Sequence, residues 1–156
     1  MSSFDPQFLG KVLTQTTSVL CTWQVSLTTD TPTPLIPAWA SGTAYLKGEV
    51  VTNDSGKVYR CITAGTTAGS GGPTGTGDDI ADNTAHWAYV PGFTQGCVVT
   101  NTDAYTPVYW GTDATITTSK ASDLIPVSIK WPIPGGPEGI YVVAGASVTI
   151  TVAAGL

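Results

Sequence analysis

The chain has 156 residues, of which 42% are hydrophobic and only 11% are charged, and its formal net charge is −5. Its six Lys and Arg residues are scattered, which argues against nucleic acid as a partner because contact with phosphates needs clustered positive charge. No apolar run approaches 18 residues, so a membrane is not an expected partner either. The 18 Gly, 11 Pro and abundant β-branched residues favour an all-β fold.

Residues 1–13 are predicted to form a short N-terminal arm. The apolar residues Phe8, Leu9, Val12 and Leu13 recur at helical spacing, so the segment is either one short helix or an extended arm. It is too short to be stable alone, and we expect it to pack on a neighbour. The beginning of the chain, residues 1–6, lacks the charged n-region and the apolar h-region of a secretory signal, so synthesis in the cytoplasm is expected.

The segment 16–28 alternates between apolar and polar residues, which predicts a half-buried strand. One face carries Val19, Cys21, Trp23, Val25 and Leu27. The run 31–34, Thr-Pro-Thr-Pro, then interrupts strand pairing and marks the beginning of a different region.

Residues 36–92 form that region. Strands are predicted over 49–52 and 57–63, joined by the turn Asn-Asp-Ser-Gly at 53–56. The Gly- and Thr-rich stretch 64–79 is predicted to be a mobile surface loop, and Trp87 and Tyr89 begin the last strand.

The C-terminal part of the chain consists of short strand patterns separated by turn signals. Strands are expected over 96–100, 107–111, 114–119, 127–131, 140–144 and 148–152. Regularly spaced short strands of this kind predict a sandwich or a barrel.

The region 36–92 resembles the small chitin- and cellulose-binding modules of bacterial polysaccharide hydrolases. The positions that carry the resemblance are Trp39, Tyr45, Gly48, Glu49, Val50, Gly56, Tyr59, Cys61, Pro73 and Trp87. The resemblance implies a glycan site on Trp39, Tyr45, Tyr59 and Trp87, where sugar rings would stack on exposed aromatic rings. The chain departs from the family at 62–65, where Ile-Thr-Ala-Gly replaces the usual exposed Trp pair. The alternative is that the four aromatic residues form the small core of a short β domain.

Residues 97–156, and more loosely 14–29, are similar to small β-sandwich proteins of tailed-bacteriophage virions. The similarity lies in a Pro-Val-Tyr strand at 107–109, the strand Gly-Ile-Tyr-Val-Val at 139–143 and the closing strand Val-Thr-Ile-Thr-Val at 148–152. With the first resemblance, it predicts a β-sandwich body formed by 14–35 and 93–156, the arm 1–13, and a small β module inserted at 36–92.

Side chains with catalytic potential are few. His86 is the only histidine, and Glu49 and Glu138 are the only glutamates, none of them in a recognisable catalytic pattern. Asp78, Asp79 and Asp82 could offer oxygen ligands to Ca²⁺, but their spacing is not that of an EF-hand, and a solvated acidic loop is the favoured interpretation. We therefore expect no enzyme, no metal and no cofactor.

Three cysteines, at 21, 61 and 97, leave an odd count. Cys97 could pair with Cys21 or with Cys61, although free thiols are expected after synthesis in a reducing cytoplasm.

The first functional hypothesis is a non-enzymatic structural protein of a phage virion that decorates or cements the capsid. Its partners would be the major capsid protein or other virion proteins, or further copies of itself, and the arm contacts would be Phe4, Phe8 and Leu9. The alternatives are an adhesion module that binds a surface glycan and a tail or baseplate adaptor.

Overall fold

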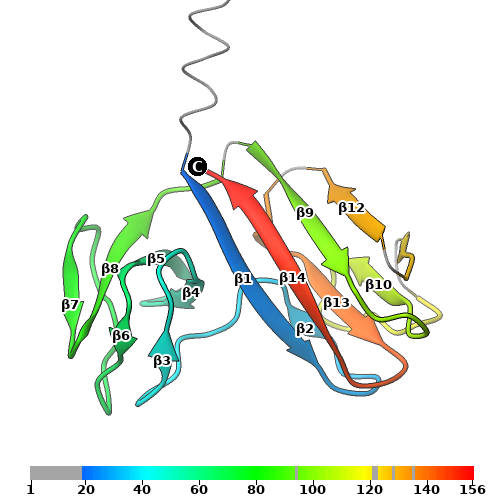
Figure 1. Ribbon diagram of the computed structural model, residues 1–156, viewed down its shortest axis with the longest axis horizontal. Coiled ribbons are helices and arrows are strands. Elements are labelled where there is room, and N and C mark those ends of the chain that lie inside the picture. Colours follow the sequence, from blue (N-terminus) through cyan, green and yellow to red (C-terminus); the bar gives the residue numbers. More distant parts are fainter. Residues whose placement is uncertain (1–18, 94, 121–122, 128, 135) are drawn as a thin grey trace, which may run out of the picture.

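The computed structural model describes residues 19–93, 95–120, 123–127, 129–134 and 136–156. Across these residues all regular structure is β-structure, with fourteen strands and no helix, which confirms the predicted all-β fold. The predicted arm, with Phe4, Phe8 and Leu9, lies outside the described residues. We call residues 36–92 the insert, and the described residues on either side of it the body (Figure 1).

The body contains two four-stranded antiparallel sheets. Sheet A has, in spatial order, β1 (Leu20–Leu27), β14 (Val148–Gly155), β9 (Gln95–Asn101) and β12 (Ile129–Ile133). Sheet B has, in spatial order, β11 (Asp123–Ile125), β10 (Val108–Gly111), β13 (Tyr141–Ala144) and β2 (Thr33–Pro34). Figure 1 shows sheet B lying behind sheet A, so that the body is a β-sandwich.

The insert forms two further antiparallel sheets. The larger has, in spatial order, β4 (Val50–Asn53), β5 (Lys57–Thr63), β8 (Ala85–Val90) and β7 (Ile80–Asp82). The smaller pairs β3 (Ala44–Tyr45) with β6 (Gly65–Thr66). The six strands β3 to β8 therefore pair only with one another, and in Figure 1 they lie beside the β1 edge of the body.

Alternation along the strands creates the core of the body. Every second residue of β1 is buried, and Trp23, Val25 and Leu27 lie directly opposite Val152, Ile150 and Val148 of β14. Because successive side chains of a strand point to opposite faces, this register directs both apolar sets into the sandwich. The opposite face of β1 stays exposed.

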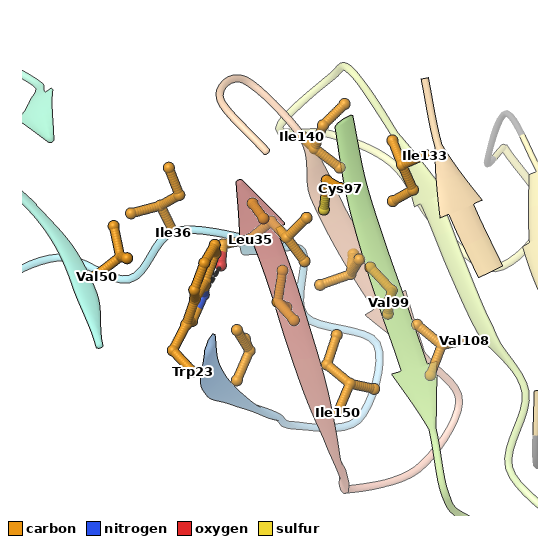
Figure 2. Packing of buried hydrophobic residues seen from close by; sticks show 14 of the residues in the cluster. Trp23, Leu35, Ile36, Val50, Cys97, Val99, Val108, Ile133, Ile140 and Ile150 are labelled. Carbon is orange, nitrogen blue, oxygen red and sulfur yellow. Dashed lines mark hydrogen bonds between the residues drawn. The ribbon is translucent and has the colours of Figure 1, made fainter. Parts of the chain in front are cut away.

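The same hydrophobic cluster continues from the body into the insert. Ile36, Val50, Val58 and Val90 of the insert belong to one buried cluster with Trp23. Figure 2 shows Trp23 between this side and the sandwich interior, with its indole N–H donating to the carbonyl of Leu35 at 2.8 Å. The two parts of the chain are therefore joined by packed apolar side chains as well as by the backbone.

The prediction of a strand over 114–119 is wrong, because this segment consists of turns and irregular structure. The carboxylate of Asp113 accepts hydrogen bonds from the backbone N–H and the hydroxyl of Thr115, at 2.8 and 3.0 Å. The carbonyl of Asp113 also accepts from the N–H of Ile116 at 3.2 Å. Local bonds of this kind compete with strand pairing, and the apolar Ile116 is buried without being in a strand.

Candidate binding surfaces

The four aromatic residues of the predicted glycan site surround the second apolar cluster of the insert. Tyr59 and Trp87 are fully buried in this cluster, whereas Trp39 and Tyr45 pack against it and are half-buried. The ring of Tyr45 meets that of Trp87 edge-on, with centroids 5.0 Å apart and an interplanar angle of 72°. The four rings thus do not form a flat exposed platform, and a sugar on this set could touch only Trp39 and Tyr45.

A buried carboxylate fixes the two tryptophans. Asp82, which is 5% exposed, accepts hydrogen bonds on Oδ2 from the indole N–H of Trp39 at 2.8 Å and of Trp87 at 3.2 Å. Its Oδ1 accepts from the backbone N–H of Ala68 at 2.8 Å. The sequence predicted that Asp82 belongs to a solvated acidic loop, and this prediction is wrong. Asp82 instead connects two aromatic rings with the Gly- and Thr-rich loop.

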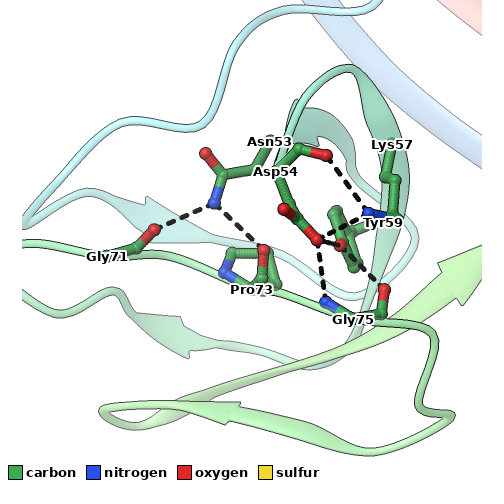
Figure 3. Close-up of polar contacts among 7 residues, drawn as sticks. All are labelled: Asn53, Asp54, Lys57, Tyr59, Gly71, Pro73 and Gly75. Carbon is green, nitrogen blue, oxygen red and sulfur yellow. Dashed lines mark hydrogen bonds and ion pairs between the residues drawn. The ribbon is translucent and has the colours of Figure 1, made fainter.

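That loop is also held from the other side, by the turn between β4 and β5 (Figure 3). The side-chain amide of Asn53 donates to the carbonyls of Gly71 and Pro73, at 2.9 and 3.0 Å. The carboxylate of Asp54 accepts from Lys57 at 2.8 Å and from the N–H of Gly75 at 3.0 Å, and these bonds lower its pKa. The sequence predicted a mobile loop, but its backbone is bonded at several points.

The loop covers one side of Trp39. A methyl group added at Gly72, whose φ is 72°, would lie only 2.8 Å from Cδ2 of Trp39. The backbone of the loop thus approaches the indole more closely than any other residue type would allow. This contact contributes to the partial burial of Trp39.

Glu49 has a structural role in the insert. Its carboxylate accepts a hydrogen bond from the N–H of Leu46 at 2.6 Å and closes the turn between β3 and β4. Gly48 in the same turn has φ 97°, and its carbonyl accepts from the N–H of Thr22 in β1 at 3.2 Å. The turn therefore joins the insert to the edge of the body.

Among the described residues, no group of three or more potential ligands is arranged to hold a metal ion. Asp79 is bonded to His86, with 2.6 Å between Oδ1 and Nδ1, and Asp82 is bonded to the indoles. The acidic cluster seen in the sequence is thus divided among different partners.

Cys21, Cys61 and Cys97 are buried free thiols. Cys21 and Cys97 lie opposite the same residue, Ala154, from the two sides of β14. Two strand spacings amount to about 10 Å, which exceeds the ~7 Å limit between the Cα atoms of a disulfide. Cys61 belongs to the separate apolar cluster of the insert.

Burial raises the pKa of the Cys97 thiol to about 12. Low exposure and a high pKa make the Cys97 thiol unreactive.

The outer face of sheet A combines a polar half with an apolar half. Across the sheet, Gln24, Thr151, Thr100 and Lys130 form one row of facing residues. The next row, toward the beginning of β1, consists of Thr22, Ala153, Val98 and Pro132.

The apolar half ends at the side chain of Leu20, which is 64% exposed. A hollow of about 360 Å³ lies beside it, and its walls include Leu20, Val98, Pro132 and Ala153. This surface was not predicted from the sequence. The outward alternation of β1 was visible, but which residues of β14, β9 and β12 stand beside it depends on strand order.

The described residues contain no helix with the length and apolar character needed to cross a membrane. No family model, curated protein or solved structure matches the chain, so its resemblance to virion proteins and to carbohydrate-binding modules stays a hypothesis.

Proposed function

We propose that this protein is a non-enzymatic structural component of a tailed-bacteriophage virion and that it decorates or cements the capsid. The observation that carries the proposal is the outer face of sheet A. A sheet face whose facing rows carry Lys130 as their one charged residue, and which has an exposed apolar end, suits permanent contact with another protein, because burying Leu20 there removes apolar surface from water.

The arrangement of the two parts supports the same proposal. The insert lies beside the β1 edge of the body and does not cover the outer face of sheet A (Figure 1). The body can therefore dock on a capsid subunit while the insert stays accessible. Many copies on a symmetric shell would gain avidity even if each contact were weak. The arm contacts proposed from the sequence, Phe4, Phe8 and Leu9, lie outside the described residues.

The test is an add-back experiment with purified capsid shells that lack this protein. Wild-type protein should bind the shells, and Leu20→Asp should weaken binding by about tenfold or more, because a buried Leu contributes roughly 1.5–3 kcal/mol. Leu124→Asp is the matched control, since Leu124 is 38% exposed but belongs to β11 of sheet B. Failure of the wild-type protein to bind, or equal binding by both variants, would contradict the proposal.

A tail or baseplate adaptor would use the same kind of surface but in few copies. Quantitative mass spectrometry of purified particles separates the two locations. Decoration requires a copy number similar to that of the major capsid protein, whereas an adaptor would be present in a small multiple of the tail symmetry.

A further inference from the structure

One turn of the insert borders the outer face of sheet A. It is the turn between β3 and β4, in which the carbonyl of Gly48 accepts from the N–H of Thr22 in β1 at 3.2 Å. A hollow of about 300 Å³ lies between this turn and the sheet. Its walls include residues of both parts of the chain, namely Leu46, Lys47, Thr22, Gln24 and Thr151. The turn therefore stands beside the outward side chains of β1 and β14.

The two most exposed large aliphatic side chains of the described residues lie on two sides of Thr22. Leu46 is 71% exposed and Leu20 is 64% exposed. Leu20 precedes Thr22 on the outward side of β1, about 7 Å along the strand, and Leu46 lines the same hollow as Thr22. Single exposed apolar residues are common on protein surfaces, but neighbouring ones form a patch that marks a contact site.

The position of Leu46 relative to the sheet is fixed by several contacts. The N–H of Leu46 donates to the carboxylate of Glu49 at 2.6 Å, which closes the turn. The carbonyl bond to β1 ties the turn to the edge of the body, and Val50, directly after the turn, is buried in one cluster with Trp23. A partner that binds both parts therefore loses little entropy in ordering them, because the two apolar side chains are already placed side by side.

The charges on this side of the molecule restrict the kind of partner. The chain has a net charge of −5, but the exposed side chains of Lys47 and Lys130 stand at the two edges of the outer face of sheet A. The one carboxylate that lines the hollow, that of Glu49, is bonded to the N–H of Leu46. Asp103 lies at the far end of the face, near the end of β1. Positive groups on either side of apolar residues suit a partner with carboxylates at its rim.

We infer that the β3–β4 turn of the insert forms one docking surface with the outer face of sheet A, and that this surface fits an apolar patch of the capsid subunit flanked by carboxylates. Leu20 and Leu46 are the apolar anchors, and Lys47 and Lys130 pair with the carboxylates. The inference rests on the proposed function and adds that the insert takes part in the contact. One turn of the insert thereby fixes the orientation of the body on the shell, while the rest of the insert stays accessible.

The test compares variants in their binding to purified shells that lack this protein. Leu46→Asp should weaken binding by about tenfold or more, as is expected for Leu20→Asp, whereas Leu124→Asp should stay within about twofold of wild type. Lys47→Glu should weaken binding by about tenfold at low salt and by less in about 0.5 M NaCl, because salt screens exposed charges. Lys120→Glu, in the turn before β11 of sheet B, is the matched charge control. The melting temperatures of all five variants should equal that of wild type, because the replaced side chains are exposed.

Acetylation of lysine side chains in the bound and the free protein gives an independent readout. Binding to the shells should protect Lys47 and Lys130 severalfold, because a docked partner covers their amino groups. Lys120 should react equally in both states. Mass spectrometry of the digested protein measures the three sites in one experiment.

The outcomes separate this inference from the proposed function. Equal binding by Leu46→Asp and wild type, or equal acetylation of Lys47 in the bound and the free protein, would overturn the inference. If Leu20→Asp still weakens binding in that case, the decoration proposal stands and the contact is limited to the body. A wild-type protein that does not bind the shells would overturn both.

Discussion

At the scale of single residues, Asp82 has the most demanding environment in the insert. One nearly buried carboxylate accepts three hydrogen bonds, two from indole groups and one from the backbone. The sequence shows Asp82 near two other aspartates, and this spacing suggested a solvated acidic loop. Neighbours in sequence could not reveal the difference, because the donors come from residues 39, 68 and 87 and meet only after the strands have paired.

Replacing Asp82 should destabilise the protein in proportion to the donors that lose their acceptor. Asp82→Ala leaves three N–H groups without their partner, and we expect the free energy of unfolding to fall by about 2–4 kcal/mol. Asp82→Asn keeps one oxygen but turns an N–H₂ group toward a donor. Its free energy of unfolding should therefore fall by less than that of Asp82→Ala, but by a measurable amount. Urea unfolding followed by tryptophan fluorescence measures both. Asp78→Ala, at an exposed position of the same loop, should change stability by less than about 0.5 kcal/mol. Equal midpoints for Asp82→Ala and Asp78→Ala would show that the network does not contribute to stability.

At the scale of elements, strand length decided what could be predicted. The alternation in β1 and β14 and the apolar run of β13 gave their positions to within a few residues, because each extends over enough residues to show a period. The two-residue strands β2, β3 and β6 show no period and were missed. Pro132 did not prevent β12 from forming, since β12 is an edge strand of sheet A.

The close contact between β6 and the beginning of β8 provides a test of this local packing. A methyl group at Gly65 would lie 2.3 Å from backbone atoms of Thr84, and backbone cannot move aside as a flexible side chain can. Gly65→Ala should therefore lower the free energy of unfolding by about 1–3 kcal/mol. Gly69→Ala is the matched control, because a methyl group there meets no atom within 4 Å. Thermal unfolding of the two variants gives the comparison, and equal melting temperatures would mean that the contact between β6 and Thr84 is looser than described.

At the scale of the whole molecule, the sequence predicted which stretches form strands better than it predicted which surfaces stay free for a partner. Leu20 carries the proposed docking surface, and it was not singled out from the sequence. Exposure of an apolar residue depends on what the rest of the chain covers, so a local pattern does not contain it. Tyr59 and Trp87, which the resemblance placed in a possible glycan site, fill the small core of the insert, in line with the alternative interpretation of these aromatic residues.

The apolar cluster shared by body and insert leads to a prediction about deletion. Removing 36–92 and joining the flanks with a short Gly/Ser linker leaves the strand pairs of sheets A and B intact, so the body should still unfold in one cooperative transition. Its free energy of unfolding should be lower by about 2 kcal/mol or more, because Trp23 loses apolar neighbours from the insert.

The control for this deletion is Trp23→Ala in both chains. It should cost about 3–5 kcal/mol in the full chain and clearly less in the shortened one, where part of the packing is already gone. Circular dichroism during urea unfolding measures all four proteins. A shortened chain without a cooperative transition would show that the body cannot fold without the insert.

Trp23 contacts the chain on both sides of the insert. Its indole is bonded to Leu35, the last residue before the insert, and its ring lies 6.0 Å from that of Phe93, just after it. The backbone thus leaves the body at Leu35 and returns to it at Phe93, and both residues contact the side chain of Trp23. Any folded sequence whose ends lie close together could occupy the same place without a change in the order of the body strands. Exchange of such a cassette would give the body a new surface in a single genetic step, and the same junction is a rational position for displaying foreign domains.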